Sequence, residues 1–89
     1  MHGPDTSKQL TASGYVVDAD TTIVVSALSI HSEGAAGGIN LLEGEGGTIR
    51  WQLECVNTGS EGQAFPTGLA IKGAYIEVDA NVHACIAYH

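Results

Sequence analysis

The feature that most constrains the fold of this chain is the distribution of its glycines. Twelve glycines separate short apolar runs, and these runs lack the apolar repeat of about 3.6 residues that indicates a helix. Segment 21–31, TTIVVSALSIH, is rich in β-branched residues and lies between two turn-forming stretches, so we predict a long strand there. The chain is therefore predicted to be all-β, with strands joined by turns.

Segment 47–56, GTIRWQLECV, shows strict alternation of apolar and polar residues. Its apolar residues are Ile49, Trp51, Leu53 and Cys55. This pattern predicts an antiparallel strand with one face in the core, and we expect Trp51, at the centre of that face, to be mostly buried. Further strands are predicted at 9–17, 38–44, 67–73, 74–79 and 82–88.

Two predicted strands are apolar on both faces. In 82–88, alternation places Val82, Ala84, Ile86 and Tyr88 opposite His83, Cys85 and Ala87. In 21–31 it places Ile23, Val25 and Ala27 opposite Val24, Leu28 and Ile30. Such a strand is either central between packed layers or covered by another subunit. Since two of them are hard to bury within 89 residues, we expect subunit contacts, which would also hold both chain ends in place.

The predicted architecture is a single domain at 11–89, preceded by a short N-terminal arm at 1–10. Strands at roughly ten-residue spacing favour an antiparallel β-sandwich or a jelly-roll-like small barrel of six to eight strands. With 44% hydrophobic and only 15% charged residues, the chain is apolar for a small monomer, which again favours an oligomer.

Net charge excludes some classes of partner. The chain carries −7, and its cations are three isolated residues, Lys8, Arg50 and Lys72. Nucleic acids and anionic membranes need clustered cations, so neither is expected as a partner. We find no secretory signal and no apolar segment of about 18 to 20 residues that could span a membrane. An intracellular product, or one exported within an assembly, is expected, with Cys55 and Cys85 as free thiols.

Candidate metal ligands are scattered. His31, His83 and His89, with Cys55 and Cys85, could supply zinc ligands but lack the paired spacing of zinc sites. The HAC sequence at 83–85 does place two ligand types on one strand face. A half-buried histidine beside a small apolar thiol is the interpretation we favour.

Acidic pairs and serines also lack the surroundings that chemistry requires. Asp18 with Asp20, and Glu43 with Glu45, lie in turns where they could hold calcium weakly, although a solvated acidic loop is the simpler interpretation. The serines of the long strand have no nucleophile-elbow sequence around them; they are Ser26, Ser29 and Ser32. The glycines at 44–47 lack the lysine and helix of a phosphate loop. We therefore predict no catalytic residue, no cofactor and no metal site, and no enzyme.

The order of the segments resembles that of small all-β virion proteins encoded in the structural gene clusters of tailed bacteriophages. The matching pieces are ASGYV (12–16), the β-branched strand at 21–31, a strand with a Gly/acid turn at 40–44, FPTGL (65–69) and the final strand at 82–88. The resemblance covers about four-fifths of the chain and rests on strand patterns.

This resemblance implies a capsid decoration or cement protein, commonly a homotrimer, that binds the major capsid protein of a phage head. It would be assembled in the host cytoplasm and located on the capsid surface of the virion. The alternative within the same class is a tail or head fibre or knob component with glycan-binding loops. From another class, a small enzyme or a metal-dependent lectin would use the acidic loops to hold Ca²⁺, and a chelator would then change its melting temperature.

Overall fold

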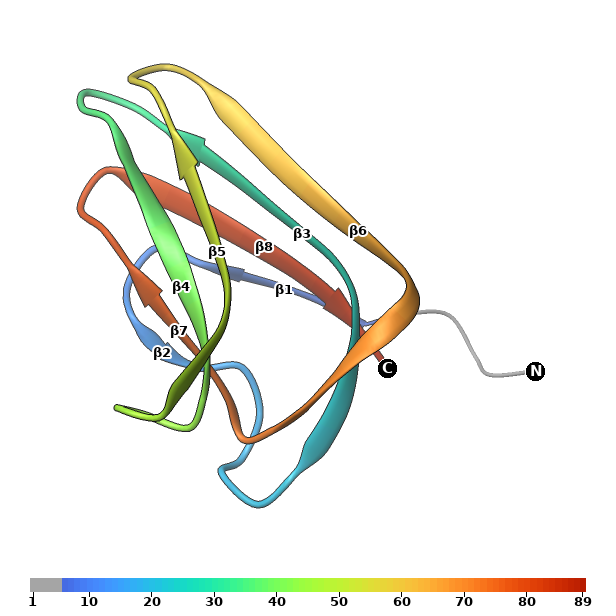
Figure 1. Ribbon diagram of the computed structural model, residues 1–89. Helices are drawn as coiled ribbons and strands as arrows, with labels where there is room; N and C mark the ends of the chain where they lie inside the picture. The colour runs from blue at the N-terminus through green and yellow to red at the C-terminus, as the bar shows by residue number, and fades with distance from the viewer. Residues whose placement is uncertain (1–5) are drawn as a thin grey trace.

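The computed structural model describes residues 6–89, which form two four-stranded antiparallel sheets packed face to face (Figure 1). Sheet A has the order β1 (Thr6–Leu10), β8 (Val82–Tyr88), β3 (Thr22–Ser32) and β6 (Ser60–Lys72). Sheet B has the order β2 (Gly14–Tyr15), β7 (Ala74–Val78), β4 (Gly37–Glu43) and β5 (Thr48–Cys55). The predicted all-β sandwich is confirmed: residues 6–89 form eight strands and no closed barrel.

The N-terminal part of the described chain joins the sandwich. Residues 6–10, which were expected to belong to an arm, form β1 and pair with β8 from Thr6 opposite Tyr88 to Leu10 opposite Ala84. Residues 1–5 of the expected arm lie outside the described residues. The single strand predicted at 9–17 is wrong, because the chain leaves sheet A after Leu10 and re-forms as β2 beside β7 in sheet B.

The final strand, β8, is a central strand of sheet A. It lies between β1 and β3, and its inner residues Val82, Ala84 and Ile86 are fully buried. Beyond it, His89 exchanges two backbone hydrogen bonds with Val24, at 2.8 and 3.0 Å. The C-terminal residues are therefore held by the fold itself. Of the two alternatives for a strand that is apolar on both faces, a central place between packed layers or cover by another subunit, β8 shows the central place.

A β-bulge near Ser26 changes which residues of β3 face the core. The pairing of β3 with both neighbours shifts between Val25 and Ala27, so one extra residue enters the strand. An extra residue reverses the facing of everything after it. Val25 and Leu28 are consequently both buried, and the prediction that they lie on opposite faces is wrong.

A second bulge, at Arg50, divides the apolar stripe of β5. Leu41 pairs with Trp51 and Leu42 pairs with Ile49, which leaves Arg50 as the extra residue. Trp51 therefore faces the core together with Leu41, while Ile49 turns outward and is 49% exposed. The prediction that Ile49 and Trp51 share the core face is wrong, because the alternation of apolar and polar residues in the sequence does not reveal an inserted residue.

Strand β6 begins earlier than predicted and is kinked. It starts at Ser60, and the residues between Ala64 and Leu69 leave the ladder with β3. The kink requires Gly68, whose φ is +80° and whose Cα lies so close to Val24 that a Cβ would be 2.3 Å from its Cγ1.

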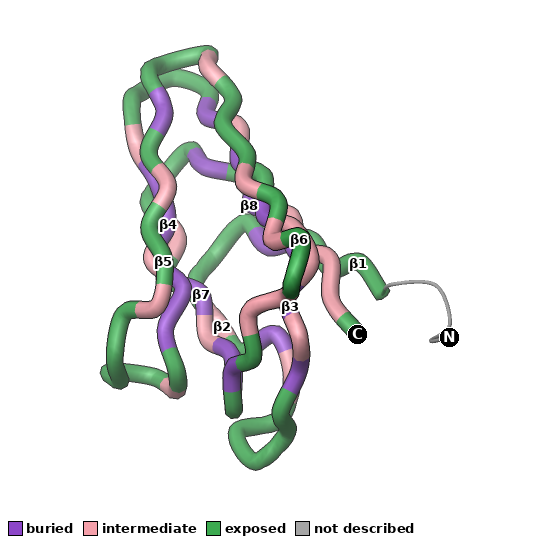
Figure 2. Tube along the Cα trace, turned by 45° about the vertical axis from the view of Figure 1, so that its right-hand side comes forward, coloured by how far each residue is buried: buried purple, intermediate pink, exposed green. Residues whose placement is uncertain are grey.

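The core lies between the two sheets, and buried residues occur in strands of both (Figure 2). Its most deeply buried side chains are Val25, Leu28, Leu41, Ile71, Ile76, Val82 and Ile86. In the described part of the chain, one buried polar side chain accompanies them: the Ser32 hydroxyl contacts the carbonyl oxygens of Ala35 and Val56, each at 2.9 Å. This contact ties together the two loops at one end of the sandwich.

Candidate functional site

The two lateral margins of the sandwich are closed in different ways. At the β1 and β2 margin, the Lys8 side chain reaches across from sheet A, and its Nζ donates to the carbonyl oxygens of Tyr15 at 3.2 Å and Val16 at 3.3 Å. A charged donor pairs well with backbone carbonyls, so this margin is bridged by hydrogen bonds.

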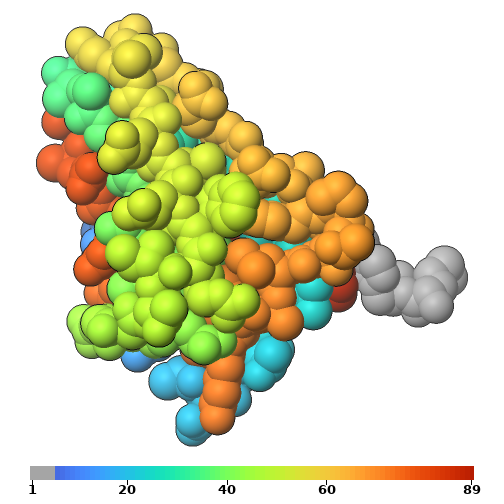
Figure 3. All heavy atoms as spheres, in the orientation of Figure 1, coloured from blue at the N-terminus to red at the C-terminus, as the bar shows by residue number. Residues whose placement is uncertain are grey.

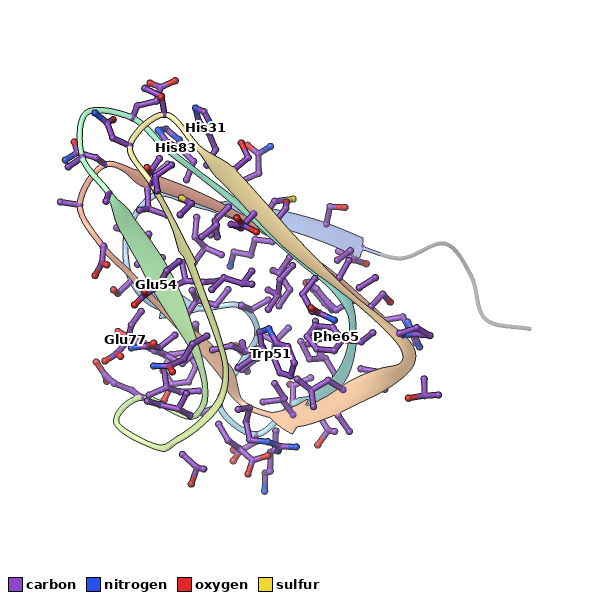
Figure 4. The ribbon with its side chains drawn as sticks, turned by 45° about the horizontal axis from the view of Figure 1, so that its top comes forward. His31, Trp51, Glu54, Phe65, Glu77 and His83 are labelled. Carbon is purple, nitrogen blue, oxygen red and sulfur yellow. The ribbon has the colours of Figure 1, made fainter. Side chains whose placement is uncertain are left out.

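The β5 and β6 margin is closed by aromatic rings and remains partly open. Trp51 of β5 and Phe65 of β6 meet edge to face, with ring centroids 5.1 Å apart (Figure 4). Trp51 is 36% exposed, so the prediction that it is mostly buried is wrong. The reason is topological: β5 is an edge strand, so its inner face has neighbours on only one side. On the molecular surface, the yellow-green residues of β5 adjoin the orange residues of β6 (Figure 3).

The outer face of sheet B carries an apolar row. Register places Tyr15, Tyr75, Leu42 and Ile49 side by side across its four strands. The two tyrosine rings meet edge to face at 4.9 Å, and Glu45 contacts both. Partial burial raises the pKa of Tyr75 above 10.0, and the neighbouring Glu45 carboxylate raises this pKa further. The Tyr75 phenol is therefore held as a neutral hydrogen-bond donor.

A row of polar side chains lies beside this apolar row, on the same outer face of sheet B. Gln52 donates to Asn40 at 2.8 Å, and Asn40 donates to Glu77 at 3.0 Å, which links three strands of sheet B. Glu54 and Asp79 complete the wall of a polar hollow of about 170 Å³ next to this row. The hollow offers amide and carboxylate groups that can bind hydroxyl-bearing or cationic ligands.

The candidate zinc ligands are only partly brought together. His31 and His83 are register partners on β3 and β8, on the outer face of sheet A (Figure 4). His31 hydrogen-bonds to Ser60 at 3.0 Å and to Glu33 at 3.2 Å. A hollow of about 370 Å³ lies beside the two histidines, and its wall includes Gln9, Ser29 and Cys85.

The remaining candidates lie elsewhere. Cys55 is in the other sheet, and His89 is at the far end of β8, where its ring is 3.4 Å from the Ser26 hydroxyl. Within residues 6–89, His, Cys, Asp and Glu side chains form no group of three or more that could hold a metal ion. Cys55 and Cys85 are free thiols, as predicted.

The acidic pairs do not act as pairs. Glu43 binds Arg50 at 3.2 Å and accepts a hydrogen bond from the Lys72 backbone, whereas Glu45 turns toward the tyrosines. Asp18 and Asp20 lie exposed in the turn that precedes β3. Ser32, one of the candidate nucleophiles, is buried, and two carbonyl oxygens share its single hydroxyl proton, so its role is structural.

Two features of the β5 and β6 margin leave no signal in the sequence: the place of Phe65 in a strand and the bulge at Arg50. The segment that holds Phe65 contains Pro66 and Gly68, which usually interrupt strands. The bulge at Arg50 leaves no signal in the alternation of apolar and polar residues.

Comparison with known protein families, with curated proteins and with solved structures finds no match to this chain. In the part of the chain that the structure describes, no helix is long and apolar enough to cross a membrane.

Proposed function

We propose that this chain is a structural virion protein that decorates and stabilises a phage capsid, bridging neighbouring capsomers as a homo-oligomer. The observation that carries the proposal is the partly open aromatic margin at Trp51 and Phe65. Exposed large aromatic side chains supply much of the binding energy of protein interfaces, because they bury a large area with little loss of conformational entropy. The resemblance to small phage virion proteins suggests the shell as partner and a trimer as the assembled form.

Charge favours a partner surface that carries basic groups. Lys8 is bonded inward to backbone carbonyls and Arg50 is paired with Glu43, so carboxylates dominate the outer surface of a chain whose net charge is −7. Complementary charge guides association and selects the partner. A decoration protein of this kind would stabilise the shell by binding its expanded state in preference to other states.

The test is to image virions of a phage that carries this gene, with and without the protein. We expect density for the sandwich on the outside of the head, and we expect heated or osmotically shocked capsids to lose DNA sooner without it. Purified Trp51→Ala protein should restore less protection than wild type. Density on the tail or on a fibre, or capsids equally stable without the protein, would contradict the decoration function.

A second candidate is a fibre or knob component that binds a glycan. The polar row of Gln52, Asn40 and Glu77, beside the tyrosines of sheet B, favours it, since amide and carboxylate groups recognise sugar hydroxyls. Glycan-array binding that is lost in Asn40→Ala and unaffected by a chelator would support this candidate. Binding that requires Ca²⁺ would instead support the lectin.

A further inference from the structure

The four edges of the two sheets are unequally protected against pairing with another strand. Edge strands expose unpaired N–H and C=O groups, and proteins commonly block them with inward-pointing lysines, short strands, prolines or bulges. Here β1 directs Lys8 into the sandwich, β2 has two residues, and β6 contains Pro66 within its kink. On β5 the only such device is the bulge at Arg50, so residues 51–55 form an open edge.

The open edge of β5 adjoins the exposed apolar margin. Trp51 and Leu53 point inward from this edge, but Trp51 is exposed and Leu53 is only half-buried, as is Phe65 opposite them. A strand added beside β5 would pair its free backbone groups and would cover these side chains at the same time. Two independent features, an unprotected ladder and an incomplete core, therefore coincide at one place.

We propose that the strand that occupies this edge is β5 of a second copy, paired antiparallel about a two-fold axis at Gln52. Inward residues must meet inward residues across the new pair, so the two-fold axis must pass through a residue and not between two residues. Centring on Gln52 places Arg50 opposite the second copy's Glu54. Every other centre within 51–55 leaves Arg50 opposite an uncharged residue.

The same register completes the apolar margin. Trp51 comes to lie opposite the second copy's Leu53, and the symmetric contact repeats on the other side of the axis. Both pairs point toward the core side of the joined sheet, next to Phe65 of each copy. The two sheets B become one continuous sheet of eight strands, with an isologous, self-complementary interface.

This inference rests on the proposed function and deepens its self-association part: it assigns the open aromatic margin to contact between copies, so that other surfaces of the dimer would meet the shell, and it predicts a dimer where the resemblance implies a trimer. It is tested on the isolated protein and does not involve capsids. A failure of capsid binding would therefore leave the inference about β5 pairing intact. A protein that does not pair through β5 would likewise leave capsid binding open to its own test.

The experiment is a charge-swap series followed by light scattering at concentrations from about 1 to 100 μM. Wild type should be a dimer. Glu54→Arg places like charges opposite each other at two symmetric positions and should weaken the dimer about tenfold or more. The double variant Arg50→Glu/Glu54→Arg restores opposite charges across the axis and should recover the dimer. Arg50→Glu alone, which also breaks the ion pair with Glu43, places like charges across the axis and should weaken the dimer. Asp20→Arg makes the same charge change in an exposed turn and should leave the dimer unchanged.

Hydrogen exchange of the wild-type protein gives a second, independent measurement that does not depend on any variant folding. Amides of 51–55 that point away from β4 should exchange more slowly at high protein concentration than at low concentration. A wild-type monomer at about 100 μM, a trimer that Glu54→Arg leaves intact, or exchange in 51–55 that is independent of concentration would each overturn the proposal.

Discussion

Trp51 and Phe65 meet edge to face across the margin between β5 and β6, with ring planes at 86° and centroids 5.1 Å apart. The two residues belong to different sheets, and their contact joins the layers where no strand does so. Because Trp51 keeps about a third of its surface exposed, the pair both closes the sandwich and provides a surface for a partner.

Trp51→Ala should lower the free energy of unfolding by about 2 kcal/mol, less than the roughly 3 to 5 kcal/mol typical of a fully buried tryptophan. Leu41→Ala, at a fully buried position, should cost at least as much. A double-mutant cycle of Trp51→Ala with Phe65→Ala should give a coupling of about 1 kcal/mol. Urea unfolding at a concentration where all variants are monomeric measures both values; zero coupling would show that the ring contact is not stabilising.

Ser32→Ala should cost about 2 kcal/mol of stability. The substitution leaves the carbonyl oxygens of Ala35 and Val56 without the buried hydroxyl that they share. Ser29→Ala is the matched control, because Ser29 is exposed on the outer face of the same strand. If both variants unfold at the same urea concentration, the hydroxyl bridge contributes nothing.

Lys8→Met should loosen the opposite margin. Losing the hydrogen bonds to Tyr15 and Val16 is expected to cost about 1 kcal/mol and to speed hydrogen exchange in β1. It also removes the charge that protects this edge, so aggregation should increase. Lys72→Met changes an exposed lysine on β6 and controls for the loss of one positive charge; equal behaviour of the two variants would contradict the bridging role.

The protein should lose stability as the pH rises above about 10, and part of that loss should come from Tyr75. Its pKa is raised in the folded state, so between the unfolded and folded pKa values the folded protein holds more protons and unfolding becomes easier as the pH rises. Tyr75→Phe should flatten the alkaline part of the melting curve measured against pH. Identical slopes for wild type and Tyr75→Phe would refute the assignment.

Both cysteines should react with an alkylating reagent in denaturant without any reductant, since both are free. In the folded protein Cys85 should react much faster than Cys55, which is only 8% exposed. Intact-mass measurements over time separate the two. A mass that indicates fewer than two modified thiols after denaturation would show that a disulfide forms.

Much of the strand pattern was predictable from local chemistry. Segment 21–31 carries its β-branched residues and flanking turns in the sequence, and β3 forms there within one residue. The predictions failed where an inserted residue changed the register. Ser26 and Arg50 are ordinary residues in strand-like segments, and only pairing with a neighbouring strand reveals that each is extra.

By itself, the sequence determined that the chain forms antiparallel strands of a small sandwich or barrel, and that the final segment is apolar enough to be central. Tertiary structure decided which strands lie at the edges, and therefore that Trp51 is partly exposed while Leu41, its partner in the adjacent strand, is fully buried. The physical reason is that alternation reports the two faces of a strand, whereas burial also depends on the neighbours on either side. Those neighbours come from residues far away in the chain.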